Sequence, residues 1–170
     1  MNYYKKTLFL SEAAVIAAIY TVLVLAFQPI SYGPIQFRIA EALAILPYFT
    51  PAAIPGVTIG CFLSAIFTGA DVLDMIFGTL ATLIAAILSF KLRRHKLLVP
   101  IPPIISNALI IPWVLRFAYD IPDAIPYMML TVGVGELCAV GILGMLLLFA
   151  LNKVRHIIFR NSYSKEKPMG

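Results

Sequence analysis

Long apolar stretches alternate with short polar segments along this 170-residue chain. A transmembrane helix needs about 20 apolar residues, because each residue rises about 1.5 Å and the hydrocarbon core of a bilayer is about 30 Å thick. Four stretches are long enough to meet this requirement. We predict membrane-spanning helices over residues 8–27, 71–90, 97–117 and 126–152.

Three basic clusters lie beside these stretches and constrain how often the chain crosses the membrane. They occupy residues 5–6, 91–96 and 153–167 and hold 11 of the 13 lysines and arginines. Positively charged loops stay on the cytoplasmic side when a membrane protein inserts. The chain between two successive clusters must therefore cross the bilayer an even number of times.

The apolar stretch 39–67 decides the total number of crossings, because three prolines interrupt it. Read as a single kinked span, it gives five crossings and leaves the middle basic cluster outside the cell. Read as two short helices, at about 38–49 and 55–67, it gives six crossings and keeps all three clusters on one side. The predicted fold is an all-α integral membrane protein with six transmembrane helices, two of them short and proline-broken, and with both termini cytoplasmic.

The two short helices carry a further expectation about shielding. Helices of about 12 residues cannot cross a 30 Å core unaided, so their ends must be shielded by protein or line a cavity. Short segments broken by proline, here at Pro47, Pro51 and Pro55, often mark the binding site of a transporter.

Composition supports a membrane protein with one transmembrane domain, residues 1–155, and a basic cytoplasmic tail, residues 156–170. The chain is 61% hydrophobic and only 12% charged, with a mean hydropathy of +0.94, whereas a soluble domain is about 25% charged. Its net charge of +5 comes from loops and tail that meet anionic membrane lipid, so we expect no nucleic-acid partner. Cys61 and Cys138 lie in apolar runs without metal-ligand spacing, and no cofactor is expected.

The predicted topology leaves the outer side with an excess of acidic residues. Three segments, 28–38, 68–74 and 116–123, face outward, and two glutamates lie deeper in the helices that follow. Six acids oppose two bases. They are Arg38, Glu41, Asp71, Asp74, Arg116, Asp120, Asp123 and Glu136.

Glu136 is the most informative single residue, because a carboxylate near the middle of a membrane is costly and therefore functional by default. It ends the segment 131–136 (TVGVGE), whose two glycines permit close approach of a ligand or a helix. The alternative is a structural glutamate that is hydrogen-bonded or protonated.

Five further polar residues are candidates for a substrate site: Glu41, Asn107, Asp74, Gln36 and Arg38. Arg38 and Glu41 share a helix face and form either an anchoring ion pair or the mouth of a pocket. Asp71 and Asp74 begin a helix, where capping and the helix dipole are the simple explanation. Asn107 bonds either a neighbouring helix or a ligand.

Small residues on the first helix form two pairs that permit close approach of another helix. The pairs are Ala13 with Ala17 and Ala14 with Ala18. Packing within this protein is one explanation, and a docking face for a partner protein is the other.

No catalytic motif is found in the sequence, so we expect no enzymatic activity. A phosphate-binding G-x-x-x-x-G-K-[ST] loop, an H-E-x-x-H zinc motif and a serine nucleophile elbow are all missing. Both histidines, His95 and His156, lie in basic segments.

Taken together, a predicted six-helix protein of this size with an alanine stripe on its first helix resembles the substrate-binding S components of energy-coupling factor (ECF) importers. More narrowly, residues 32–46 (YGPIQFRIAEALAIL), 54–61 (IPGVTIGC) and 73–81 (LDMIFGTLA) are similar to the queuosine-precursor transporter family, QueT. The resemblance implies a multi-pass protein of a bacterial plasma membrane that captures a queuosine precursor, a deazaguanine-type base. It also implies partners, namely a transmembrane coupling protein and two ATPase subunits.

The residues suit such a ligand. A carboxylate accepts two adjacent donors of a guanine-like edge, and a precursor with an aminomethyl group is a cation suited to an acidic face. Glu41 and Glu136 are the candidates for these roles. Asn107 and Gln36 are expected to form hydrogen bonds with the remaining polar edges of the base. A stand-alone secondary transporter of a small polar or cationic metabolite, coupled to ions or protons through Glu136, is the alternative.

Overall fold

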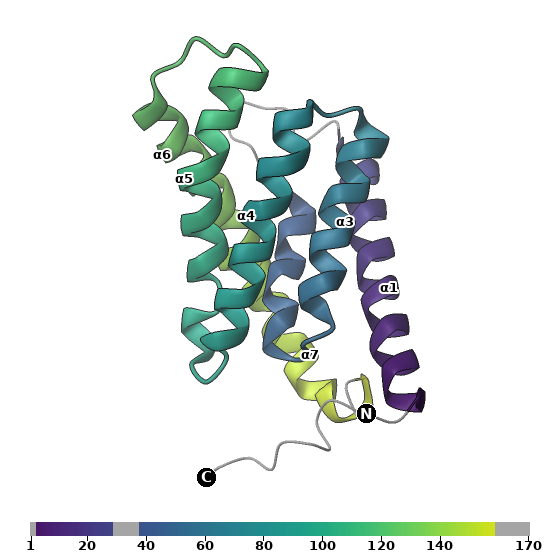
Figure 1. Ribbon diagram of the computed structural model, residues 1–170. Coiled ribbons are helices and arrows are strands. Elements are labelled where there is room, and N and C mark those ends of the chain that lie inside the picture. The colour runs from purple at the N-terminus through teal and green to yellow at the C-terminus, as the bar shows by residue number, and fades with distance from the viewer. Residues whose placement is uncertain (1–2, 29–37, 159–170) are drawn as a thin grey trace.

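The computed structural model describes residues 3–28 and 38–158, and the regular secondary structure in these two ranges is entirely helical. Figure 1 shows the helices packed side by side along a common direction as one bundle. In chain order they are α1 (Tyr3–Ala26), η1 (Ile39–Tyr48), α3 (Ala53–Thr68), α4 (Val72–Lys91), η2 (Lys96–Leu98), α5 (Ile101–Ala118), α6 (Ile125–Glu136), η3 (Leu137–Gly144) and α7 (Met145–Ile158).

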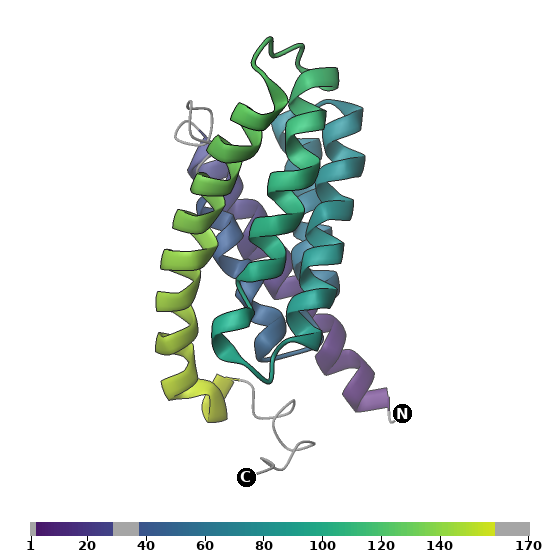
Figure 2. The same ribbon diagram turned by 90° about the vertical axis from the view of Figure 1, so that its left-hand side faces the viewer.

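The chain runs up and down the bundle, so that the predicted loops gather at two opposite ends. The start of α1, the connection between α4 and α5, and the end of α7 lie at one end (Figures 1 and 2). The α3–α4 and α5–α6 connections lie at the other end. The described parts of all three basic clusters therefore share one end, as the charge pattern requires. Most of the predicted tail, 156–170, falls outside the described residues.

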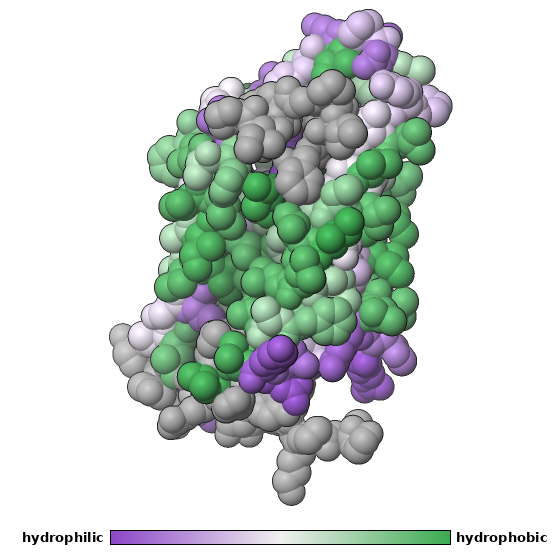
Figure 3. Space-filling view, turned by 180° about the vertical axis from the view of Figure 1, so that it is seen from behind, coloured by the Kyte–Doolittle hydropathy of each residue, from purple (hydrophilic) through white to green (hydrophobic). Residues whose placement is uncertain are grey.

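Four helical segments are long and apolar enough to cross a membrane, and they coincide closely with the four long spans predicted from the sequence. They are Lys5–Ala26, Val72–Lys91, Lys96–Ala118 and Ile125–Arg155. Figure 3 shows the consequence on one face, a broad apolar band with hydrophilic residues at both ends. An apolar band of this kind is the surface that lipid tails cover.

The interrupted stretch folds as the two short helices η1 and α3, joined by a tight turn at Phe49–Ala52. η1 is a 3₁₀ helix of 10 residues, and at about 2.0 Å per residue such a helix spans about 20 Å, compared with about 15 Å for an α-helix. Residues 40–47 of η1 are all buried. The surrounding helices therefore shield this irregular backbone from lipid, as the membrane environment demands.

Glycines in α3 bring it unusually close to α1. A Cβ atom at Gly60 would lie 2.7 Å from Cβ of Tyr20 and 3.0 Å from the carbonyl oxygen of Ala17, and one at Gly56 would lie 3.0 Å from the carbonyl oxygen of Ala13. Thr21 adds a hydrogen bond from its hydroxyl to the Gly60 carbonyl, at 3.2 Å. This close contact fixes where the inner face of α1 lies.

The last membrane-crossing segment changes its winding directly after Glu136. α6 ends there, and η3, an eight-residue π-helix, follows before α7 resumes the α-helical pattern. The π-helix packs against η1, where a Cβ atom at Gly144 would lie 3.1 Å from Ile45. π-Helical turns are uncommon and occur frequently at functional sites.

Candidate functional site

A cavity of about 180 Å³ opens between α1, η1, α3, α4 and the α5–α6 connection. Its wall includes the last residue of α3, the residue after α5 and the residue before η1, which are Thr68, Tyr119 and Arg38. The cavity therefore lies at the end of the bundle opposite to the described parts of the basic clusters. Most of its lining is apolar, with a few polar groups, as is typical of small-molecule sites.

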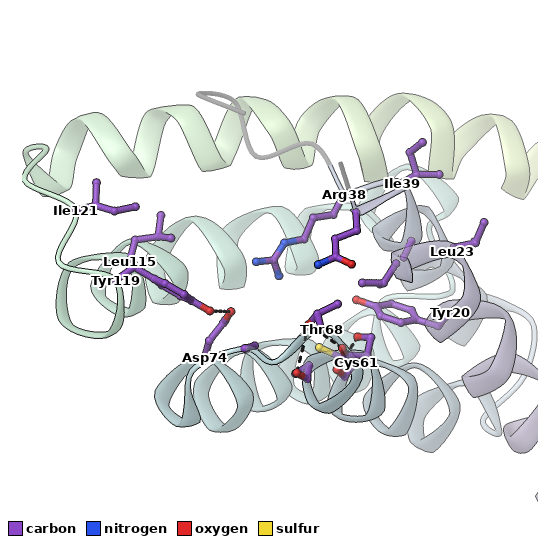
Figure 4. A pocket seen from close by; sticks show the side chains of 17 residues that line it. Tyr20, Leu23, Arg38, Ile39, Cys61, Thr68, Asp74, Leu115, Tyr119 and Ile121 are labelled. Carbon is purple, nitrogen blue, oxygen red and sulfur yellow. Dashed lines mark hydrogen bonds between the residues drawn. The ribbon is translucent and has the colours of Figure 1, made fainter. Parts of the chain in front are cut away.

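Two charged residues face this cavity from opposite walls (Figure 4). Arg38 precedes η1, and its guanidinium group points into the cavity, while Asp74 comes from the first turn of α4. Both side chains are half-buried. Among the described residues, no salt bridge joins the two groups, and Arg38 makes no side-chain hydrogen bond. A guanidinium group has five N–H donors, so Arg38 offers unused donors to whatever enters the cavity.

Tyr119 holds Asp74 in place at the cavity wall. Its hydroxyl donates a 2.9 Å hydrogen bond to Oδ2 of Asp74 and accepts a 3.3 Å hydrogen bond from the backbone N–H of Asp71. Asp71 itself caps α4, because its carboxylate accepts a 2.8 Å bond from the N–H of Leu73. The end of α5 is thereby tied to the start of α4.

A second group of polar residues is buried deeper in the bundle. Tyr20 donates a 2.6 Å hydrogen bond to Oε1 of Glu41, and the side-chain amide of Asn107 donates a 2.7 Å bond to Oε1 of Glu136. The four side chains come from α1, η1, α5 and α6 and are at most 4% exposed. Such hydrogen bonds are needed because an unpaired polar group in an apolar interior costs several kcal/mol, roughly 2–7.

One atom of this buried group has no hydrogen-bond partner in the part of the chain that the structure describes. Oε2 of Glu136 is buried and makes no hydrogen bond to any described residue. Tyr20 lines the cavity and bonds Glu41, so the buried group begins directly behind the cavity wall. The arrangement can bind a polar molecule at two charged groups, and it holds further hydrogen-bonding residues in fixed positions behind them.

The sequence profile of the QueT transporters matches residues 10–153. The chain belongs to the QueT transporter family. A relative from Lactococcus lactis subsp. cremoris (strain MG1363), named queuosine precursor transporter QueT, is 41% identical over 81 residues, which make up 46% of this chain and 47% of that protein. The match thus spans about half the length of this curated relative. No solved structure matches the chain.

For this QueT family member, the structure separates the predicted site residues into two groups. Arg38 and Asp74 line the cavity. Glu41, Asn107 and Glu136, predicted as substrate-binding residues, lie behind the cavity wall and form hydrogen bonds with side chains of the protein. Gln36 lies outside the described residues.

The two alanine pairs of the first helix also separate. Ala13 and Ala17 are buried, at 6% and 4% exposure, because they pack against α3. Ala14 and Ala18 are exposed on the outer surface of α1. Only the second pair is therefore free to contact another protein.

Sequence reasoning missed Tyr20 and Cys61 as cavity residues. Tyr20 follows Ala13 and Ala17 at helical spacing, and a tyrosine hydroxyl in a buried position needs a hydrogen-bond partner. That signal could have pointed to Glu41. In the described residues, no group of three or more His, Cys, Asp or Glu side chains could hold a metal ion.

Proposed function

We propose that this protein is the substrate-binding component of an importer and takes up a queuosine precursor, a deazaguanine-type base. The observation that carries the proposal is the cavity in which Arg38, which has no hydrogen-bond or salt-bridge partner among the described residues, faces a carboxylate, in a chain that belongs to a transporter family. The name of the Lactococcus relative supports the substrate class. Both guanidinium and carboxylate groups form charge-assisted hydrogen bonds with polar heterocycles.

The size of the cavity supports a small ligand. Pockets for drug-sized molecules have volumes of about 300–1,000 Å³, and this cavity is smaller, at about 180 Å³. Its lining combines the aromatic rings of Tyr20 and Tyr119 with small residues such as Ala65 and Gly78. A single planar base with polar edges suits such a cavity better than a nucleoside with its sugar.

The proposed orientation has both termini in the cytoplasm of a bacterium and the cavity near the outer surface of the plasma membrane. It follows from the three basic clusters, whose described parts lie at the end of the bundle opposite to the cavity. Lys and Arg next to a span favour the cytoplasmic side, where anionic lipids add to their attraction. An importer binds its substrate from outside the cell, so its binding site must be open to that side.

The proposed partners are a transmembrane coupling protein and two ATPase subunits, as in ECF importers. No G-x-x-x-x-G-K-[ST] loop occurs in this chain, so energy from ATP must come from other subunits. Ala14 and Ala18 present small side chains on the exposed side of α1, and small residues allow close helix packing in membranes. We assign the contact with the coupling protein to this pair.

A stand-alone secondary transporter is the second candidate, and one observation favours it. Glu136 carries a buried oxygen without a partner in the described residues, and intramembrane acids of this kind serve in proton and ion pathways. Such a carrier would transport a small polar or cationic metabolite without ATPase subunits.

Ligand binding tests the main proposal. The purified full chain is titrated calorimetrically with 7-aminomethyl-7-deazaguanine, guanine and adenine. We expect the deazaguanine to bind and adenine, which lacks the guanine edge, to bind far more weakly. Absence of binding by every guanine-like base would overturn the assigned substrate class.

Cysteine protection locates the ligand. Cys61 lines the cavity, whereas Cys138 does not. Bound base should therefore slow the reaction of Cys61 with a small methanethiosulfonate reagent and leave the reaction of Cys138 unchanged. Equal rates at Cys61 with and without a base that binds would place the site elsewhere.

Transport in reconstituted vesicles separates the two candidate functions. Vesicles that contain only this protein should bind the base but not accumulate it, and addition of the coupling protein, the ATPase subunits and ATP should start accumulation. Accumulation by the protein alone under an ion or proton gradient would support the secondary transporter instead.

A further inference from the structure

We propose that Asp74 is the residue that selects for a cationic amine arm on the base, while Arg38 binds the ring carbonyl across the cavity. The inference rests on the proposed function, because it assumes that the ligand is a deazaguanine-type base. The proposed contacts of Asp74 and Arg38 assign one end of the ligand to each wall of the cavity. They also predict which of the possible precursors binds more tightly.

The geometry of Asp74 points to a single strong donor. Tyr119 already occupies Oδ2, and no described residue donates to Oδ1. A Cβ atom at Gly78 would lie 3.2 Å from Oδ1, so a side chain there would crowd the oxygen that glycine leaves open. A guanine edge with two adjacent donors needs both oxygens of a carboxylate. One open oxygen is better suited to an ammonium group.

The geometry of Arg38 points to an acceptor. Its guanidinium group faces the cavity and, within the described residues, makes no hydrogen bond or salt bridge. Arginine carries donors only, so its natural partner is a carbonyl oxygen or an anion. A ring carbonyl placed here satisfies the arginine, and the same molecule can reach Asp74 with its other end.

The space between the two groups supports a bridging ligand. Opposite charges that share a half-buried cavity attract each other, and Asp74 favours the charged form of Arg38. The two side chains nevertheless do not form a salt bridge with each other. They project from different elements, since Asp74 lies on α4 and is held by Tyr119, whereas Arg38 directly precedes η1. A molecule with an acceptor on one side and a cation on the other completes both interactions at once.

The two buried glutamates are less suitable for the amine arm. Glu41 already accepts the hydroxyl of Tyr20, and Glu136 accepts the amide of Asn107. Neither lines the cavity. Moving a cation to either of them would require the cavity wall to open, whereas Asp74 is reached directly.

Two bases that differ only in the arm at position 7 test the proposal. The purified full chain is titrated with 7-aminomethyl-7-deazaguanine, which is a cation at neutral pH, and with 7-cyano-7-deazaguanine, which is neutral. We expect the parent protein to prefer the amine. Asp74→Asn should weaken binding of the amine by about tenfold to hundredfold, because a hydrogen bond between charged groups contributes about that much to affinity. The affinity for the nitrile should stay nearly unchanged.

Three further variants complete the experiment. Asp74→Glu keeps the charge and should retain part of the preference for the amine. Asp71→Asn is the matched control on the same helix start, because it keeps a capping residue and does not line the cavity; it should change neither affinity. Arg38→Gln should weaken both bases by the same factor, because both carry the ring carbonyl.

Tyr119→Phe tests Tyr119 as a positioning residue for Asp74. Loss of the hydroxyl frees Asp74 to turn away from the ligand, so the ratio of the two affinities should fall while binding of the nitrile stays the same. A purely structural role for the tyrosine would instead lower both affinities together.

The possible outcomes separate the inference from the proposed function. If the parent binds neither base, the proposed function fails. If it binds both but Asp74→Asn weakens them equally or not at all, the function stands and the assignment of Asp74 to the amine is overturned. Should Asp74→Asn fail to fold, an equal affinity of the parent for the two bases overturns the assignment just as directly.

Discussion

Tyr20 and Glu41 share a 2.6 Å hydrogen bond that joins α1 to η1 in the interior of the bundle. Both side chains are only 2% exposed. The carboxylate is therefore largely shielded from water, and the hydroxyl of Tyr20 supplies a close donor to its Oε1 beside the side-chain amide of Asn107. Because Tyr20 also lines the cavity, this bond connects the wall of the candidate site to the short helix beside it.

Tyr20→Phe should destabilise the protein, because it keeps the ring but leaves Glu41 without this donor. A buried group that loses its partner costs about 1–3 kcal/mol, and we expect a lower unfolding temperature in detergent and weaker binding of the base. Tyr127→Phe is the matched control, since Tyr127 is 53% exposed. An unfolding temperature equal to that of the parent would show that Glu41 does not depend on the tyrosine.

The bond between Asn107 and Glu136 should appear as a coupling energy in a double-mutant cycle. Asn107→Leu and Glu136→Met remove the polar groups while they keep side chains of similar length, and residues in contact typically couple by about 0.5–3 kcal/mol. The free energies of unfolding of the single and double variants give this value. Combining Asn107→Leu with the distant Tyr127→Phe provides the control, which should couple by less than about 0.5 kcal/mol. Equal coupling in the two cycles would contradict the observed bond.

Gly60→Ala should weaken the packing of α1 on α3. The added methyl group would lie 2.7 Å from Cβ of Tyr20 and 3.0 Å from a backbone oxygen, so the helices must move apart at a cost of about 1–3 kcal/mol. Gly133→Ala is the control, because its nearest neighbour would lie 3.7 Å away. That control should be neutral or slightly stabilising, since alanine favours helix more than glycine by about 1 kcal/mol. Equal unfolding temperatures of the two variants would show that the α1–α3 contact at Gly60 has room for a methyl group.

The long helices of this protein could be predicted because their signal is local. Apolar length alone locates spans such as Val72–Lys91, and the prolines between residues 47 and 55 correctly divide the stretch 39–67 into two helices. The 3₁₀ geometry of η1 and the π-helical turn after Glu136 could not be predicted. Both depend on how η1 and η3 pack against each other, which no pattern within either segment records.

The candidate site could be predicted in its residue types but not in its arrangement. Depth in the membrane singled out Glu41 and Glu136, and the structure places both in buried hydrogen bonds. Their partners Tyr20 and Asn107 are 21 and 29 residues away in the chain. Such pairings arise from helix packing, between α1 and η1 in one case and between α5 and α6 in the other, and spacing in the sequence does not reveal them.

Cysteine labelling should show the cavity end of the bundle outside the cell and the basic end inside. In a variant without Cys61 and Cys138, we expect an impermeant maleimide to modify a cysteine at position 123 in intact cells and to spare one at position 96. Asp123 is preferable to Asp120, whose φ of 50° lies in the left-handed region, where aspartate is better tolerated than most residues. Permeabilised cells provide the control, in which both positions should react. Labelling of position 96 in intact cells would contradict the six-crossing topology.

The two alanine pairs of α1 should respond differently to enlargement. Ala14→Leu with Ala18→Leu enlarges the exposed pair, so it should block close approach of the coupling protein. Transport by the complete importer should then fall, while binding of the base and the unfolding temperature of the isolated protein stay the same. Ala13→Leu with Ala17→Leu makes the same chemical change on the buried pair and should instead lower the unfolding temperature, because α3 leaves no room there. If the exposed pair impairs binding as strongly as transport, its role lies within this protein and the docking face must be sought on another helix.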